Sequence, residues 1–397
     1  KKIAFKLKDN NGKIIKKTYI EFKNDVESLA TKLIDLGLKN ERIAVMGKNS
    51  YKWAISYLAS TIIGVVVPID KEASKENIKD FLNTSNSKAI IADDKYLNEI
   101  FEFKDRLKNE TLLIDMQNTS KYMNIADLIK EGQELILDGN EEYKNIKINP
   151  DEMKILLFTS GTTGNSKAVM LSHKNICSNI VSIASIVKVD NLTSVLSILP
   201  LHHTYECTIG YLLVIYGGGK ISYCEGLRYI TKNIQEFKPT FILCVPLLLE
   251  NVYKKVTKTL KTSLPEKYTK DESKMIDNLP FYLKAIVKRK VKKSLGGNIK
   301  TFIVGAAAIK PELVEAFFKL GIKVLQGYGL TECSPLVAGN NDFYYKAASC
   351  GMPIPNVEYK IDNPNDDGIG EIIVKGPNVM LGYYENKEAT DKVLKEG

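Results

Sequence analysis

The 397-residue sequence has few residues that bind transition metals and no long apolar run. It contains three histidines and six cysteines, and no two cysteines are spaced as Cys-x-x-Cys, which argues against a structural zinc site. The longest apolar stretch, residues 57–69, is interrupted by Ser60, Thr61 and Pro68 and is shorter than the roughly 20 residues that cross a bilayer. With 44% apolar and 26% charged residues, the composition is that of an ordinary soluble globular protein.

The cysteines also lack the pattern of a disulfide framework. Several lie inside apolar runs, as Cys244 does after Phe241 and two further apolar residues. We therefore expect buried free thiols in a reducing compartment, which favours a cytoplasmic protein. The six positions are Cys177, Cys207, Cys224, Cys244, Cys333 and Cys350.

Strand-like and helical patterns alternate along most of the chain, which predicts parallel sheets covered by helices. One helix is expected to begin at Asn24 or Asp25 and end at Gly37, and Ser50 is expected to open a second that stops near Gly64. After about residue 335 the pattern changes to short alternating strands, which fit a small antiparallel sheet or barrel. The expected strands span residues 42–46, 65–69, 88–92, 112–115, 153–158, 194–199, 220–223, 240–245, 301–304, 323–326, 357–361 and 370–375.

The formal net charge is +9, and residues 254–293 hold 13 basic and 4 acidic residues. Within this segment, residues 283–293 place apolar side chains at helical spacing opposite a basic face. Such a helix can rest on an anionic membrane surface or attract a phosphate-rich substrate, and it is also typical of a solvated helix face. The membrane alternative places the contact at Lys288 to Lys293. No nucleic-acid partner is expected, and the sequence predicts no oligomeric state.

A dense run of hydroxyl and amide side chains, two glycines and a lysine lies between Thr159 and Ala168. Glycine lets the backbone approach an anion, N–H groups and hydroxyls donate to phosphate oxygens, and lysine adds a mobile positive charge. The run therefore predicts a loop that wraps a polyphosphate; the alternative is a mobile polar hairpin. The candidate phosphate ligands are Thr159, Ser160, Gly161, Thr162, Thr163, Gly164 and Lys167.

This loop differs from a Walker A loop, which has glycine before the lysine and a hydroxyl residue after it. Here Ser166 and Ala168 flank Lys167. The residues that follow look like a strand, and the next helix is expected to start at Ser172 or His173. We therefore expect the loop to join two strands without the helix dipole of a Walker loop.

Three more segments follow expected strands and carry groups suited to nucleotide and carboxylate chemistry. Tyr328 lies between two glycines and can present its ring to a planar base, Thr331 can donate to a phosphate, and Glu332 is a hard oxygen ligand suited to Mg²⁺. Residues 199–206 contain two adjacent histidines and an aromatic residue. In residues 304–308, a valine is followed by a glycine and three alanines, and such small residues would let a base lie against the backbone.

These four segments resemble, in this order, the adenylate-forming superfamily of acyl-CoA synthetases, luciferases and peptide-synthetase adenylation domains. The resemblance rests on Thr-Ser-Gly-Thr-Thr-Gly-x-x-Lys from Thr159, on Tyr-Gly-Leu-Thr-Glu from Tyr328, and on a Gly-Glu-Ile-x-Val-x-Gly-Pro-x-Val-Met-x-Gly-Tyr segment that ends at Tyr383. It covers essentially the whole chain. The Pro-Leu-His-His-Thr-Tyr-Glu segment that ends at Glu206 looks most like the long-chain fatty acyl-CoA synthetase branch.

The resemblance implies an α/β fold with two helix-covered, mostly parallel sheet subdomains and a small antiparallel β-barrel-like subdomain. It assigns residues 1–38 and 192–334 to one α/β subdomain, 39–191 to the other, and 335–397 to the small one. Family members continue with a Thr-Gly-Asp motif that binds the ribose and a C-terminal lid domain that carries a catalytic lysine. The sequence stops before these, so the expectation is the large N-terminal part alone, with weak ATP binding and poor turnover.

The resemblance also implies a two-step ligase, in which ATP and a carboxylate give an acyl-adenylate and pyrophosphate, and coenzyme A then displaces AMP. It implies that Lys167 and the loop hold the β- and γ-phosphates, that Thr331 contacts the α-phosphate, and that Glu332 binds Mg²⁺ with Thr159. His203 would lie beside the acyl carboxylate, and Tyr205 would line the acyl pocket. The residues implied to contact adenine are Gly305, Ala306, Ala307, Gln326, Gly327, Tyr328 and Gly329.

Attack of a carboxylate on the α-phosphorus needs in-line positioning and neutralised charge rather than a protein nucleophile. The fatty-acid reading competes with an enzyme that adenylates aryl or other carboxylates, and with a nucleotide-binding protein that lacks catalysis. An amino-acid activator usually shows an aspartate at the start of the substrate pocket, where this sequence offers Tyr205 followed by Glu206.

Overall fold

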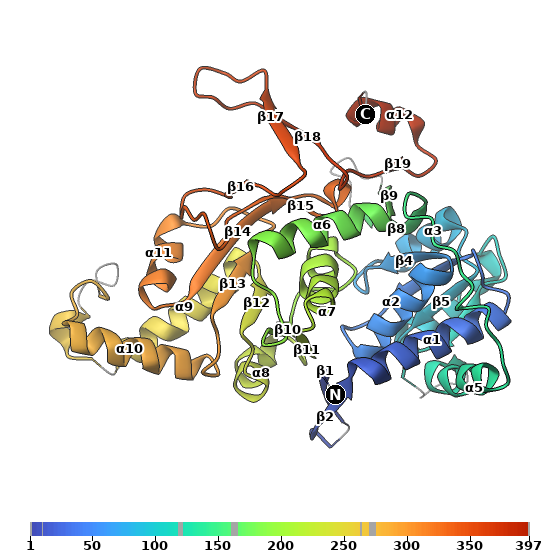
Figure 1. The fold of residues 1–397 in the computed structure, drawn as a ribbon, viewed down its shortest axis with the longest axis horizontal. Helices are drawn as coiled ribbons and strands as arrows, with labels where there is room; N and C mark the ends of the chain where they lie inside the picture. Colours follow the sequence, from blue (N-terminus) through green and yellow to red (C-terminus); the bar gives the residue numbers. More distant parts are fainter. Residues whose placement is uncertain are drawn as a thin grey trace.

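The structure, a computed structural model, describes residues 2–9, 11–117, 122–159, 166–262, 264–269 and 275–395. Over these residues the chain forms two large sheets, and helices pack against both of them (Figure 1). Most neighbouring strands within each sheet run parallel, because a helical segment separates successive strands in the sequence. The predicted α/β class is confirmed.

The first sheet consists of nine described strands. The strands from β14 to β1 pair in parallel, and β2, β15 and β16 are added in antiparallel orientation. In spatial order the sheet contains β16 (Met352–Pro353), β15 (Leu336–Gly339), β14 (Lys323–Gly329), β13 (Thr301–Val304), β12 (Phe241–Cys244), β10 (Ser194–Ser197), β11 (Lys220–Tyr223), β1 (Ile3–Lys8) and β2 (Ile14–Thr18).

The second sheet is formed mainly by the N-terminal half of the chain. Its strands from β8 to β7 pair in parallel, whereas β9 pairs antiparallel with β8 and with β19. In spatial order it contains β19 (Gly382–Tyr383), β9 (Lys167–Ser172), β8 (Met153–Thr159), β4 (Val65–Ile69), β3 (Arg42–Met46), β5 (Ala89–Ala92), β6 (Leu112–Asp115) and β7 (Met123–Asn124).

A small antiparallel sheet, β17 (Glu358–Asp362) and β18 (Glu371–Lys375), projects from the body of the molecule (Figure 1). The other strands after residue 335 belong to the large sheets, β15 and β16 to the first and β19 to the second. The boundaries of the three subdomains stay a prediction. The α-helices are α1 (Tyr19–Asp35), α2 (Tyr51–Ile63), α3 (Lys75–Ser85), α4 (Asp94–Phe101), α5 (Ile125–Leu137), α6 (His173–Ile186), α7 (Leu213–Tyr216), α8 (Ile230–Phe237), α9 (Pro246–Lys261), α10 (Phe281–Ser294), α11 (Pro311–Lys319) and α12 (Lys387–Val393). Shorter helical segments are the π-helix η2 (Tyr205–Leu212) and the 3₁₀ turns η1 (Lys104–Arg106), η3 (Leu227–Tyr229), η4 (Glu266–Tyr268) and η5 (Thr331–Cys333).

The strand predictions for residues 42–46, 65–69, 112–115, 220–223 and 301–304 match the observed bounds. The predicted start of the first helix is wrong. Helix α1 begins at Tyr19, because Thr18 caps it and forms a capping box with Glu21, whose carboxylate accepts from the Thr18 backbone N–H. Ser50 does cap α2, and Gly64 ends it.

All six cysteines are free, as predicted. Cys207, Cys244 and Cys333 are buried, whereas the expectation of burial is wrong for Cys177 and Cys350, which are exposed. Among the residues that the structure describes, every helix is too short or too polar to cross a bilayer.

Helices α1 and α5 cross at very close range over the second sheet. Gly132 of α5 faces the backbone of Ser28 in α1, and a Cβ built on Gly132 would lie 1.9 Å from the Ser28 carbonyl oxygen. Both residues are buried. The contact therefore depends on the absence of a side chain at position 132.

We predict that Gly132→Ala destabilises the protein, although alanine is the better helix former. The added methyl group would force two backbones apart, and overpacking of this kind costs about 1–3 kcal/mol. Thermal or urea unfolding measures the change, with Gln133→Ala on the exposed face of α5 as the control that should change the free energy of unfolding by less than about 0.5 kcal/mol. An unchanged or raised stability for Gly132→Ala would contradict the packing described here.

Candidate active site

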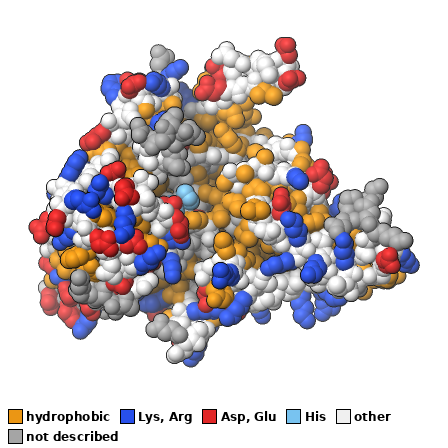
Figure 2. All heavy atoms as spheres, turned by 180° about the vertical axis from the view of Figure 1, so that it is seen from behind, with side chains coloured by type: hydrophobic (Ala, Val, Ile, Leu, Met, Phe, Trp, Pro, Cys, Tyr) orange, Lys and Arg blue, Asp and Glu red, His pale blue; other side chains and the backbone are white. Residues whose placement is uncertain are grey.

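A cavity of about 420 Å³ lies at the carboxyl ends of strands β10, β12, β13 and β14. This edge of a parallel sheet is where ligands bind in open α/β folds. Most of the wall is apolar, with contributions from Ile183 of α6, Leu199, Val245, Ile303 and Leu336. Hydrophobic side chains also gather beside a histidine on the face of the molecule in Figure 2.

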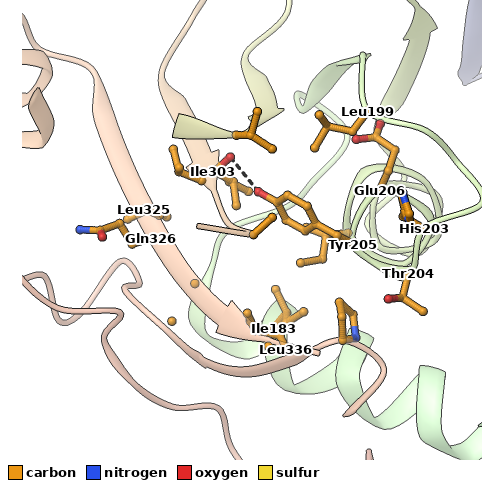
Figure 3. Close-up of a pocket in the computed structure, with 18 of the residues that line it drawn as sticks. Ile183, Leu199, His203, Thr204, Tyr205, Glu206, Ile303, Leu325, Gln326 and Leu336 are labelled. Atoms are coloured by element: carbon orange, nitrogen blue, oxygen red, sulfur yellow. Dashed lines mark hydrogen bonds between the residues drawn. The ribbon is translucent and has the colours of Figure 1, made fainter. Parts of the chain in front are cut away.

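Tyr205 stands in the middle of the cavity wall (Figure 3). Its hydroxyl donates to the Ile303 carbonyl oxygen at 2.9 Å, which fixes the ring against the end of β13. A Cβ on Gly305 would lie 3.2 Å from the Tyr205 ring, so the glycine leaves the room that the ring occupies. Tyr205 therefore defines the shape of the apolar part of the cavity.

The two adjacent histidines differ in their surroundings. His202 is buried, and burial together with the neighbouring His203 lowers its pKa to about 4. His203 is exposed and lines the cavity. Partial desolvation lowers the pKa of His203, while Asp70 acts in the opposite direction. Both imidazoles are therefore neutral near pH 7, and only His203 can reach a ligand in the cavity.

Seven of the predicted site residues line this one cavity. They come from three separate segments, the connection after β10, the end of β13 and the end of β14. The side-chain amide of Gln326 is engaged elsewhere, because its Nε2 donates to the Ala347 carbonyl oxygen at 2.6 Å. The seven are His203, Tyr205, Ala306, Gln326, Gly327, Gly329 and Thr331.

The remaining predicted residues do not line the cavity. Tyr328, with 38% of its surface exposed, lies outside it, as do Gly305 and Ala307. Lys167 and Glu332 both contact Tyr383, and Thr159 pairs with Lys167. The loop residues Ser160, Gly161, Thr162, Thr163 and Gly164 lie outside the described residues.

The loop that is predicted to bind a polyphosphate joins antiparallel strands, as expected. Thr159 pairs with Lys167 at the ends of β8 and β9, and its Oγ1 donates to the Lys167 carbonyl oxygen at 3.3 Å. Helix α6 begins only at His173, with Ser172 as its N-cap, which confirms the expected helix start. The loop therefore lacks a helix directly after it, unlike a Walker loop.

Tyr383 links this hairpin to the turn that carries Glu332. Its hydroxyl donates to Glu332 Oε1 at 2.8 Å, and Lys167 Nζ lies 4.8 Å from the centre of its ring. Tyr383 ends a motif that carries the family resemblance, but the sequence of that motif does not predict a contact with Glu332 or Lys167. The one feature that could have drawn attention to Tyr383 is its position after a glycine at the end of a strand-like motif.

Glu206, which the resemblance places at the start of the substrate pocket, has a burial and protonation that the sequence did not predict. Its side chain is fully buried in the wall of the cavity, and neither carboxyl oxygen has a partner with hydrogen-bond geometry among the described residues. Burial raises its pKa to about 8, and Ser197 and the Leu199 backbone reduce that rise. It belongs to the π-helix η2, and a Cβ on Gly210 would lie 2.7 Å from its Oε1. Glu206 is therefore protonated at neutral pH.

This protonation predicts how stability depends on pH. Between the ordinary carboxyl value of 4.5 and about 8, the folded protein keeps the proton on Glu206 whereas the unfolded chain releases it. The wild type therefore loses stability, relative to Glu206→Gln, as the pH rises through this window. We expect the melting temperature of the variant minus that of the wild type to be larger at pH 8 than at pH 5. The exposed Glu134→Gln serves as the control, and parallel curves for Glu206→Gln and the wild type would contradict a buried neutral acid.

Comparisons with known proteins place these features in a family. The chain is 27% identical to a chloroplastic long-chain-fatty-acid–[acyl-carrier-protein] ligase of Arabidopsis thaliana, with 96% of this chain and 61% of that protein covered. It is 28% identical to long-chain-fatty-acid–CoA ligase 5 of Rattus norvegicus, with 95% and 60% covered. The chain thus spans about 60% of the length of these two relatives.

Solved structures share the fold. The crystal structure of a long-chain-fatty-acid–CoA ligase from Archaeoglobus fulgidus has a TM-score of 0.77 at 22% identity, with 98% of this chain and 75% of that chain covered. ATP-bound MatB from Rhodopseudomonas palustris has a TM-score of 0.76 at 21% identity, with 100% and 71% covered. The family model described as AMP-binding enzyme matches residues 1–384. The chain belongs to the AMP-binding enzyme family.

Proposed function

We propose that this protein is an ATP-dependent carboxylate–coenzyme A ligase that activates a long-chain fatty acid. The observation that carries the proposal is one cavity with two kinds of wall. Small residues at the ends of β13 and β14 suit a nucleotide, and an apolar chamber around Tyr205 suits an acyl chain. Membership of the AMP-binding enzyme family and the names of the curated relatives support the same activity.

In the first step, a carboxylate oxygen of the acid attacks the α-phosphorus of ATP. An oxygen–phosphorus bond forms, the bond to the bridging oxygen breaks, and pyrophosphate leaves with its electron pair. In the second step, the thiolate of coenzyme A attacks the acyl carbon, and AMP leaves. The protein's task in both steps is to hold the reacting atoms in line and to neutralise charge.

The nucleotide side of the site uses backbone and hydroxyl groups. We assign adenine contact to residues 305–307 and 326–329, contact with the α-phosphate to Thr331, and contact with the β- and γ-phosphates to Lys167 and the loop that begins at Thr159. At Gly329 a side chain is excluded, because a Cβ there would lie 2.0 Å from the Pro335 carbonyl oxygen, and the glycine leaves bare backbone at the wall of the cavity.

The donor set fits Mg²⁺. Glu332 keeps Oε2 available because Tyr383 occupies Oε1, and the described residues hold no cluster of three acidic, histidine or cysteine side chains that would cage a metal ion. Mg²⁺ is commonly held by one or two carboxylates together with substrate phosphates and water. Glu332, with Thr159, would hold the ion, whose chemistry when bound is to neutralise phosphate charge. Glu332 and Lys167 would keep the phosphates in position.

The acyl side of the site is apolar and carries no fixed charge. His203 is neutral near pH 7, so it would position the substrate carboxylate through a hydrogen bond rather than through a permanent positive charge. Glu206 is also neutral, so it offers no anion to pair with a substrate amine. This argues for a simple fatty acid over an amino acid. The buried thiols take no part, because burial raises the pKa of Cys207 and Cys333 to about 12.

A panel of carboxylates, from acetate to oleate with aryl acids added, tests the proposal in the full-length protein. We expect pyrophosphate release that depends on long-chain acids, and thioester formation with coenzyme A. Acyl carrier protein is included as a second thiol, because one relative is named for that acceptor.

Lys167→Ala and Glu332→Gln are expected to lower the rate by about 100-fold or more, as for other groups that stabilise transition-state charge. Lys174→Ala, an exposed lysine at the start of α6, is the control. Preference for aryl acids would favour the aryl-ligase alternative. Nucleotide binding without carboxylate-dependent pyrophosphate release would favour a non-catalytic protein.

We further propose that helix α10 makes a peripheral contact with the inner, anionic face of the membrane in a cytoplasmic protein. Val287 and Val291 pack into the core, whereas Phe281 is 88%, Tyr282 63% and Ile286 56% exposed. Basic side chains follow on the exposed surface of the same helix. Exposed aromatic residues beside lysines and arginines suit an anionic lipid interface, where fatty acids also partition.

Sedimentation with phosphatidylserine vesicles tests this contact. We expect binding at low salt that falls at high salt, because screening weakens surface charges. The test variant replaces four exposed basic residues of α10 by glutamine, and the control variant replaces four exposed lysines elsewhere. Loss of binding is expected only for the α10 variant, and a wild type that does not sediment at low salt would overturn the proposal. The test set is Lys288, Arg289, Lys290 and Lys293, and the control set is Lys130, Lys144, Lys147 and Lys387.

A further inference from the structure

The segment of residues 377–384, here called the strap, crosses from the turn that carries Glu332 to strand β9, which carries Lys167 (Figure 1). On one side, the Met380 N–H donates to the Glu332 carbonyl oxygen at 2.8 Å. On the other side, the N–H groups of Leu381 and Tyr384 donate to carbonyl oxygens of β9 at 2.9 and 2.8 Å. The strap therefore ties an element of the first sheet to an element of the second.

Tyr383 is the strap residue whose side chain enters the space between these two elements. Only 6% of its surface is exposed. Its backbone is held by pairing with Val169 and by the Thr390 hydroxyl, which accepts from the Tyr383 N–H at 2.9 Å. The preceding Gly382 has φ of +134°, a conformation that side chains rarely adopt, so the turn that aims Tyr383 requires glycine. The direction of the ring is thus set by the backbone.

The ring contacts two opposite charges at two different places. The hydroxyl donates to Glu332, while the face of the same ring holds the Lys167 ammonium group 4.8 Å from its centre. Within the described part of the chain, no ion pair is found for either Lys167 or Glu332. A phenol is suited to both contacts, because its O–H donates to a carboxylate and its π face attracts a cation. Each charge therefore stays free for a ligand.

We infer that Tyr383 is the positioning residue of the phosphate and metal side of the site, holding Glu332 for the cation and Lys167 for the phosphates. This inference rests on the proposed function, because it takes the ligand to be a nucleoside triphosphate with its divalent cation. Tyr383 acts through the two charged residues and takes no part in bond making.

Tyr383→Phe separates the two contacts, because it keeps the ring beneath Lys167 and removes the hydrogen bond to Glu332. Calorimetry on the full-length protein measures the affinity for a non-hydrolysable ATP analogue with and without Mg²⁺. We expect the affinity with Mg²⁺ to fall about tenfold, as for a lost hydrogen bond to a charged group, and the affinity without metal to change little. Tyr383→Leu removes both contacts and is expected to weaken both affinities.

Two controls make the result specific. Tyr384→Phe changes the neighbouring tyrosine, whose ring lies 4.8 Å from the Arg42 guanidinium, and should bind as the wild type does. Adding Tyr383→Phe to Glu332→Gln should cause no further loss of Mg²⁺-dependent affinity, because the partner of the hydroxyl is already neutral. If Tyr383→Phe acted only by destabilising the protein, it would lower the affinity both in the wild type and in Glu332→Gln.

If Tyr383→Phe melts at a much lower temperature, Thr390→Val replaces it as the test. Thr390→Val removes the hydroxyl that holds the Tyr383 backbone N–H. It should also lower the affinity for the ATP analogue with Mg²⁺, by less than Tyr383→Phe does. A wild type without Mg²⁺-enhanced binding would refute the metal assignment of the proposed function itself. A wild type with enhanced binding and a Tyr383→Phe variant equal to it would overturn this inference alone.

Discussion

The parallel register of strands β12, β13 and β14 is the constraint on which the site depends. Cys244, Val304 and Gln326 align across the three strands, so the chain leaves the sheet at the same edge each time. The Gly305 N–H still donates to the Cys244 carbonyl oxygen at 3.4 Å, which extends the alignment one residue beyond β13. Segments that lie far apart in the sequence therefore meet around one cavity, and shifting one strand would disperse them.

The cavity combines an apolar wall with titratable groups that carry no charge near pH 7. Desolvation lowers the pKa of His203 and burial keeps Glu206 protonated, so neither adds a charge to this wall near pH 7. An ionised Glu206 in this medium of low dielectric would strongly repel a carboxylate. A protonated Glu206 therefore lets the carboxylate substrate that we propose enter the cavity. The polar chemistry is concentrated instead around Lys167 and Glu332. Such a division suits the reaction that we propose, which joins an apolar acid to a highly charged nucleotide.

The sequence allowed the strand ends to be predicted better than the contacts between them. Ala306, Gly329 and Thr331 each follow an expected strand, and parallel strands bring their carboxyl ends together, so their meeting was foreseeable. The strand-like residues after Lys167 also predicted that the loop after Thr159 joins two strands, which the structure confirms. The family resemblance added His203 to this group, although periodicity alone gave no reason to choose it over His202.

Other features depend on packing that no local pattern encodes. The contact of Tyr383 with Glu332 joins residues 51 positions apart and exists only because the strap lies across both sheets. The pKa of Glu206 depends on burial within a π-helix, and a glutamate beside an aromatic residue could equally have been exposed. The start of α1, in contrast, could have been predicted from the local sequence, because Thr18 and Glu21 form a recognisable capping box.

The strap also shows how the two large sheets would be held in place for the chemistry that we propose. Lys167 belongs to the second sheet and Glu332 to a turn after the first, so their separation is fixed only by what connects the sheets. An ion pair between the two groups would neutralise both of them and leave neither for a phosphate or a cation. The fold gives each charge a different part of one buried phenol, and no ion pair between the two is found among the described residues. Preorganisation of opposite charges is what a site for a metal-bound polyphosphate requires, since the ligand brings both signs of charge with it.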